Sequence, residues 1–155
     1  PLPPGPRFAG DFVLRDPPVG VLQVTVNAQS GAGGATPFAF ALPIVAAMPP
    51  TVLPPTLTPD AIPAVRATPV VVAASVLDDC RVRWVIVQAD LGKGFRRVGS
   101  LKDNGKRGDA VAGDGVFGGV GKIKASSPRG VPVRVVARNG AKLIGTSPVT
   151  MLQIQ

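Results

Sequence analysis

The sequence lacks most of the side chains on which enzyme active sites depend. It contains no histidine, tyrosine or glutamate, and its single cysteine, Cys80, has no second cysteine with which to form a disulfide. Without histidine, the usual general base and the commonest metal ligand are both missing. Serine and lysine occur without a nucleophile motif, and no Gly-Lys-Ser/Thr phosphate loop accompanies the glycines of residues 113–121. We therefore predict no enzymatic activity.

Long apolar segments and aromatic residues are also scarce. No apolar run approaches the ~20 residues that cross a bilayer, so no membrane span is expected. The aromatic residues are six phenylalanines and Trp84, too few for a base-stacking platform, so no nucleic-acid partner is expected. We predict that Trp84 and Cys80 are core residues. No signal peptide is recognisable, and the start at Pro1 without methionine suggests a processed or excised segment.

Proline and glycine are abundant instead. They number 18 and 19 among 155 residues, while 45% of the chain is apolar and rich in valine and alanine. This apolar content is too high for a disordered chain, and the frequent breaks leave little room for helices. The composition therefore favours many short strands between turns, an all-β fold.

Two segments near the N-terminus alternate between apolar and polar residues. They span residues 19–29 and 37–45, are separated by a turn at 30–34, and follow a short apolar run at 12–14. On each strand the large apolar residues recur at every second position, which is typical of a half-buried strand. These positions are Leu22, Val24 and Val26 on the first strand and Phe38, Phe40 and Leu42 on the second.

A longer series of strands occupies the rest of the chain. Residues 47–66 are proline-rich and are interpreted as a linker running into an edge strand near 51–58, because proline donates no ladder hydrogen bond. A turn is expected at 59–63, and an Asn-Gly hairpin turn at 138–140. Further strands are expected at 69–77 (buried), 81–89 (inward face ambiguous), 95–101, 116–124, 131–137 and 147–154. About seven strands at this spacing predict an antiparallel β-sandwich.

The N-terminal strands resemble the C-terminal ones at a shift of 111 positions. The matched positions are Leu22, Val24 and Val26 with Val133, Val135 and Ala137, Thr36-Pro37 with Ser147-Pro148, and Phe38 and Phe40 with Val149 and Met151. A shift of 109 also places Phe8 on Phe117. Residues 1–46 are therefore predicted to be the last three strands of a second, incomplete sandwich.

An incomplete sandwich leaves a sheet edge and an apolar face uncovered. We expect other copies of this chain, or another fragment of the same precursor, to supply the missing strands by strand addition. The alternative is that these strands pack onto the second domain as one larger sandwich.

One long connection, residues 101–117, concentrates acidic residues and glycines in the run LKDNGKRGDAVAGDGVF. Oxygen ligands suit calcium, so the side chains of Asp103, Asn104, Asp109 and Asp114 are candidate calcium ligands. The spacing does not match an EF-hand, and neighbouring cationic residues offset the charge. The alternative is that these side chains cap turns by accepting backbone N–H bonds, with no cofactor at all.

The same run resembles a loop of bacterial immunoglobulin-like and fibronectin-type-III-like repeats, Leu-x-Asp-Asp-Gly-x-x-Gly-Asp-x-x-x-Gly-Asp-Gly-Val-Tyr. Asn104 replaces the second aspartate and Phe117 replaces the tyrosine. The resemblance extends over residues 50–155. It implies an antiparallel immunoglobulin-like β-sandwich at residues 67–155, after the partial domain at 1–46 and the linker at 47–66. It also implies a non-enzymatic repeat module of an extracellular or cell-surface protein.

The charge is positive and uneven. The formal net charge is +8, and 14 of the 17 lysines and arginines lie from Arg81 onward, against four aspartates there. A basic surface suits an acidic partner such as an anionic glycan, although scattered cations are also typical of a solvated face. Two functions are therefore considered: a structural or adhesive module of a surface fibre, layer or large secreted protein, and a module that binds an anionic glycan.

Overall fold

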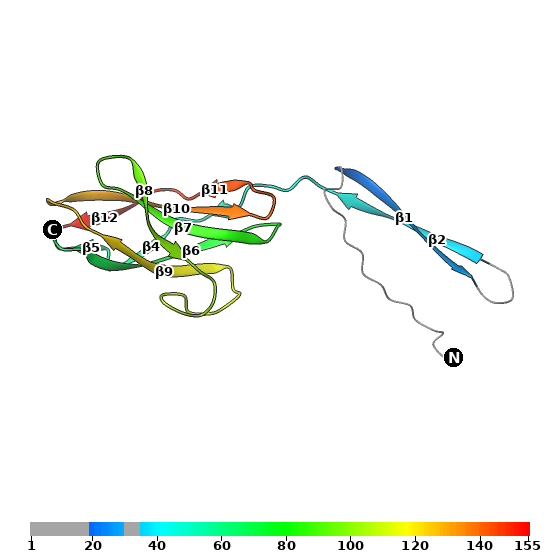
Figure 1. Cartoon of the computed structure of the whole chain (residues 1–155), viewed down its shortest axis with the longest axis horizontal. Coiled ribbons are helices and arrows are strands. Elements are labelled where there is room, and N and C mark those ends of the chain that lie inside the picture. The colour runs from blue at the N-terminus through cyan, green and yellow to red at the C-terminus, as the bar shows by residue number, and fades with distance from the viewer. Residues whose placement is uncertain (1–18, 30–34) are drawn as a thin grey trace. The chain divides into compact units, whose positions relative to one another are not determined.

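The computed structural model describes residues 19–29 and 35–155, which form strands and loops with no helix among them. The chain divides into two compact units, Pro1–Ala46 and Ala47–Gln155 (Figure 1). Within the part of the chain that is described, no helix could cross a membrane. The predicted all-β fold class is confirmed.

The first unit contains an antiparallel hairpin. Strand β1 (Gly20–Gln29) pairs with β2 (Ala35–Ile44) along its whole length, from Gly20 opposite Ile44 to Gln29 opposite Ala35. Both strands follow the expected segments to within two residues. The predicted turn at 30–34 and the third strand expected near 12–14 lie outside the described residues.

One face of this hairpin is apolar and open. The register places Leu22, Val24 and Val26 opposite Leu42, Phe40 and Phe38, so all six share that face. The rings of Phe38 and Phe40 lie 5.9 Å apart between centroids. Phe38 is 66% exposed and Val26 is 52% exposed. Among the described residues, neither strand pairs with a third, so both outer edges keep unpaired backbone groups.

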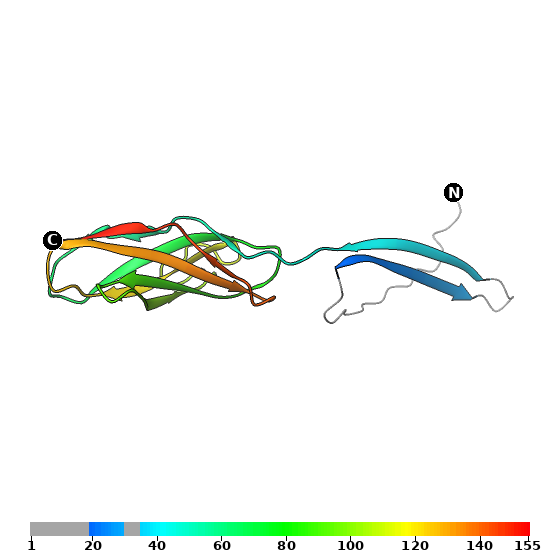
Figure 2. The ribbon, with the colours of Figure 1, turned by 90° about the horizontal axis from the view of Figure 1, so that it is seen from above.

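The second unit is a sandwich of two sheets (Figure 1, Figure 2). The larger sheet has the order β5-β12-β10-β7-β8, with β11 also on β10, and in the smaller sheet β3, β4 and β9 all pair with β6. Every pair is antiparallel except β5 with β12. The strands are β3 (Thr51–Val52), β4 (Thr56–Thr58), β5 (Ala61–Ile62), β6 (Thr68–Leu77), β7 (Val82–Asp90), β8 (Phe95–Leu101), β9 (Val116–Ile123), β10 (Arg129–Asn139), β11 (Ile144–Thr146) and β12 (Thr150–Ile154).

The core lies between the two sheets and consists mainly of valine. Alternate residues of each strand point inward, because successive side chains of a strand lie on opposite faces. The fully buried side chains include Val70, Val72, Val85, Val87, Val131, Val133, Val135, Ile123 and Leu152. Each contributes roughly 1.5–3 kcal/mol by leaving water. β-Branched side chains suit this position because they pack well on a pleated surface.

Two expectations about strand faces are corrected by this packing. The buried face of β7 carries Val85, Val87 and Ala89, so Trp84 lies half-buried on the opposite, outer face and is not a core residue. Strand β6 was expected to be buried throughout, but only its inner face is buried, and Val71 on its outer face is 36% exposed. Each sheet therefore has one face against the core and one toward solvent.

The proline-rich residues 47–66, expected to form a linker and an edge strand, supply three short strands to the sandwich. Strands β3 and β4 both pair with β6, and the break between them contains Pro54 and Pro55, which have no N–H to donate. The expected turn at 59–63 contains β5, which crosses to the other sheet and pairs in parallel with β12. The chain thus contributes to both sheets before β6 begins.

The turn after β10 differs from the expected Asn-Gly hairpin. Strand β10 continues through Asn139, and residues 140–143 connect it to β11. The left-handed conformation falls on Lys142, with φ of 68°. The buried side chain of Asn139 accepts the Leu143 N–H at 3.0 Å and so closes the turn. The asparagine was correctly placed at the turn, but its role is that of a side-chain cap.

At the predicted shift of 111 positions, the large apolar residues of β2 match exposed residues in or next to β12 and not its buried ones. At a shift of 111, Phe38 and Phe40 match Val149 and Met151, which are 49% and 47% exposed. The buried side chains of β12 are Leu152 and Ile154. A shift of 112 places Phe40 and Leu42 on these two residues and so agrees better with the buried positions of β12.

Candidate functional site

The Asp/Gly loop, residues 102–115, connects β8 to β9 and is held at its base by backbone contacts. Lys102 and Gly118 exchange two hydrogen bonds, with N–H to O=C distances of 2.8 and 2.9 Å. A side chain at Gly118 would not fit, because its Cβ would lie 2.3 Å from the backbone of Gly108 and Asp109. The glycine therefore lets the returning loop lie directly against β9.

Inside the loop, three carboxylates accept backbone N–H groups. Asp109 Oδ2 accepts those of Asn104 and Gly105. Asp103 accepts the N–H groups of Gly113 and Gly115, the latter at 3.0 Å, and Asp114 Oδ1 accepts that of Val116 at 2.9 Å. The predicted turn-capping role of these aspartates is therefore present in the structure.

The same three carboxylates lie close to one another. One oxygen each from Asp103, Asp109 and Asp114 lies within 4.8 Å of the others. Asp109 is only 6% exposed, and its Oδ1 atom is buried with no hydrogen-bond partner. Three of the four candidate calcium ligands therefore come together.

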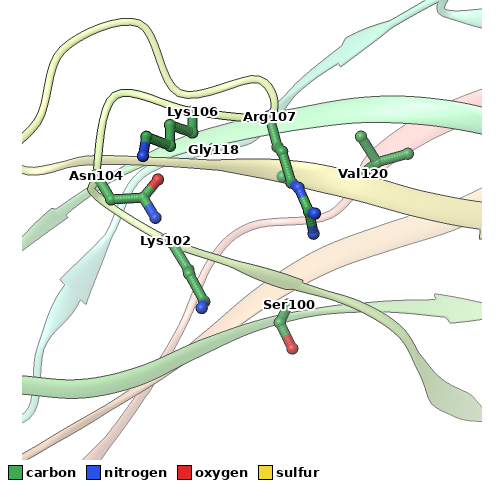
Figure 3. Close-up of a pocket in the computed structure, with 8 residues that line it drawn as sticks. Ser100, Lys102, Asn104, Lys106, Arg107, Gly118 and Val120 are labelled. Atoms are coloured by element: carbon green, nitrogen blue, oxygen red, sulfur yellow. The ribbon is translucent and has the colours of Figure 1, made fainter.

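Asn104, the fourth candidate, is separated from this cluster by the direction of its side chain. Its backbone N–H binds Asp109, while its side chain lines a pocket on another side of the loop. Figure 3 shows its amide among cationic side chains. Of the four expected ligands, the three aspartates lie close together, and the predicted role of Asn104 as a ligand stays a prediction.

That pocket is cationic and has a volume of about 480 Å³. Lys102, Lys106 and Arg107 come from the loop, and Ser100 and Val120 come from the strands on either side (Figure 3). None of the three clustered aspartates lines it. The hydrogen bonds that those carboxylates accept from described residues all come from backbone N–H groups. The loop therefore presents its positive and negative side chains on different sides.

A second basic pocket, of about 370 Å³, adjoins the first. Ser100 and Lys102 line both pockets, and Arg83, Trp84 and Arg97 line the second together with apolar residues of β7 and β8. This surface is not apparent from the sequence, because the apolar residues around Trp84 predict a place for it in the core. The alternation on β7 contained the signal: with Val85 and Val87 buried, Trp84 falls on the outer face beside neighbouring cations.

Cys80 also departs from its expected place in the core. It is half-buried and lines a surface pocket together with Asp78 and Val82. Partial burial, together with the adjacent Asp79 and Asp78 carboxylates, raises the pKa of its thiol. A raised thiol pKa lowers the thiolate fraction at neutral pH and makes the cysteine less reactive.

A comparison with protein-family models gives no match, and a comparison with curated proteins gives none either. The resemblance of the Asp/Gly loop to bacterial repeat modules therefore remains a prediction based on the loop residues themselves. What the geometry offers is a basic surface, a cluster of three carboxylates of which only Asp109 is buried, and an apolar hairpin face.

Proposed function

We propose that this chain is a non-enzymatic structural or adhesive module of an extracellular or cell-surface assembly. In this proposal the hairpin β1–β2 is completed by strands from another copy of the chain or from another fragment of the same precursor. The observation that carries the proposal is the apolar face of the hairpin, with six large apolar side chains on one side of a sheet that has two strands among the residues described.

Energetics favour a partner for this hairpin. A two-stranded sheet is marginally stable in water, and covering each large apolar side chain contributes roughly 1.5–3 kcal/mol. Val26 and Phe38 face each other at one end of the ribbon and are both more than half exposed. Strand addition would give backbone partners to the edges that are unpaired among the described residues, and a second sheet of the partner would bury this face.

We also infer that the second unit is an immunoglobulin-like sandwich of the fibronectin-type-III kind. Its chain alternates between the sheets: β6 lies in the smaller sheet, β7 and β8 in the larger, β9 in the smaller and β10 in the larger. Interleaving of this kind is typical of Greek-key sandwiches. Such modules commonly serve as repeats in surface proteins, which supports the structural role.

Light scattering after size-exclusion chromatography tests the assembly. The 155-residue chain should elute as an oligomer rather than at its monomer mass of 15.8 kDa. The double variant Phe38→Ser, Phe40→Ser should be monomeric, because it replaces the two aromatic side chains of the apolar face with polar ones. Val21→Ser is the matched control, since Val21 is 65% exposed on the opposite face of β1. A monomeric wild-type chain at high concentration would end the self-assembly proposal.

A second candidate function is the binding of an anionic glycan at the two basic pockets. Arg97, Lys102 and Arg107 provide charge, and Trp84 provides a flat apolar surface beside them. No aspartate lines either pocket, which favours an anionic ligand over a neutral one.

Calorimetric titration with sulfated oligosaccharides of defined length tests this second function. Binding should saturate and should weaken about tenfold or more in Lys102→Ala and in Trp84→Ala. Lys122→Ala is the charge-matched control, because Lys122 is exposed on β9 outside both pockets. Equal weakening in the control would mean that only the net charge matters, and the proposal would fail.

A further inference from the structure

We propose that the three aspartates of the Asp/Gly loop form a calcium site. The first argument is distance. Calcium binds oxygen at 2.3–2.6 Å, so two oxygens on opposite sides of one ion lie about 4.8 Å apart. One carboxylate oxygen each from Asp103, Asp109 and Asp114 lies within 4.8 Å of the others, a separation that suits three ligands of one ion.

The second argument is the unpartnered oxygen of Asp109. Asp109 is 94% buried, and its Oδ2 atom accepts two backbone N–H groups while its Oδ1 atom accepts none. A buried carboxylate oxygen without a donor is unfavourable, and native structures normally satisfy such atoms. A cation beside the cluster supplies the missing interaction.

The third argument is charge. Three carboxylates this close repel one another unless positive charge lies near. The lysines and the arginine of the loop, which could supply it, line the cationic pocket on another side. The remaining compensation comes from backbone N–H groups, which carry only partial charge. A divalent ion is therefore the fitting complement to the cluster.

The ligand chemistry favours calcium over magnesium. Magnesium requires nearly ideal octahedral geometry at about 2.1 Å, whereas calcium accepts six to eight oxygens in irregular arrangements. The loop is irregular, with positive φ at Gly105, Gly113 and Gly115. Backbone carbonyls and water would complete the coordination shell. The site lies in the second unit and does not depend on the assembly proposed for β1–β2.

Thermal unfolding and calorimetric titration of the full chain with calcium chloride test the site. Calcium should bind with a stoichiometry of one and raise Tm by about 5 °C or more relative to a chelator at equal ionic strength. Asp114→Asn should weaken binding about tenfold or more, because it removes one ligand charge. This variant should fold, since Asp114 is exposed and the amide oxygen can still accept the Val116 N–H.

Asp90→Asn is the matched control. Asp90 caps its own glycine turn by accepting the N–H groups of Gly92 and Gly94 at 2.8 and 3.0 Å, and it lies outside the cluster. The affinity of the Asp90→Asn variant for calcium should equal that of the wild type. An identical Tm in calcium and chelator would overturn the site. The site would also be overturned if magnesium raised Tm as much as calcium does, or if Asp90→Asn and Asp114→Asn lost the same calcium affinity. Either result would mean that the ion only screens the charge of the protein.

Discussion

At the residue scale, a few polar side chains hold the ends of the sandwich together. Asn139 is 1% exposed, and its amide nitrogen donates to the Met48 carbonyl at 2.8 Å and to Asp78 Oδ1 at 3.1 Å. Through these bonds one side chain joins the start of the second unit, the turn after β6 and the turn after β10. Ser147 acts similarly, accepting the Val135 N–H at 2.9 Å.

Replacement of Asn139 by alanine should lower the free energy of unfolding by about 2–4 kcal/mol, because three hydrogen bonds are lost and buried partners remain unsatisfied. Chemical denaturation followed by tryptophan fluorescence measures this. Asn104→Ala is the control, since Asn104 is exposed and its side chain lines an open pocket, and it should change stability by less than about 0.5 kcal/mol. Equal effects in the two variants would contradict the bridging role of Asn139.

At the scale of elements, the sequence predicted strand positions better than strand faces. Turn residues and prolines predicted the ends of the strands. Strand β8 matches its expected residues, and the ends of β1 and β2 differ from the expected ones by two residues or fewer. The predicted inward face was wrong where both sides of a strand are apolar, as in β7. In such a strand the apolar and polar residues do not alternate, so the sequence does not show which side points inward. The three-aspartate cluster could be predicted from composition, but the direction of Asn104 depends on backbone turns that the sequence leaves open.

Strand β12 offers a direct test of face assignment. Leu152 is fully buried, whereas its neighbour Met151 is 47% exposed. Leu152→Ala should cost about 2–5 kcal/mol through lost burial and a new cavity, and Met151→Ala should be nearly neutral. Urea denaturation of both variants measures the difference. A larger loss of stability in Met151→Ala than in Leu152→Ala would mean that Met151 faces the core, and it would favour the repeat at a shift of 111.

At the scale of the whole molecule, the two units differ in how their apolar residues are arranged. The second unit buries a continuous valine core between two sheets, while the described strands of the first leave apolar side chains exposed. The sequence predicts an incomplete first sandwich from the resemblance between its N-terminal and C-terminal strands. It indicated an edge strand near 51–58 but not that residues 47–66 supply strands to both sheets, because their pairing joins segments far apart in the chain.

Residues 47–155 expressed alone should fold and unfold in a single cooperative transition, because this unit contains its own core and both of its sheets. Residues 1–46 alone should give no cooperative transition, because a two-stranded sheet is marginal in isolation. Calorimetry and circular dichroism of both fragments measure this. A fragment 47–155 that aggregates or melts without cooperativity would show that the units depend on each other.

Asn104 links the two sides of the Asp/Gly loop: its N–H holds Asp109, and its amide lines the cationic pocket. A ligand on either side therefore restrains the same short piece of backbone. Thermodynamic reciprocity requires that, if a divalent ion sharpens the affinity for an anion by some factor, the anion sharpens the affinity for the ion by the same factor. A surface built from this module would then adhere according to the mineral content of its surroundings.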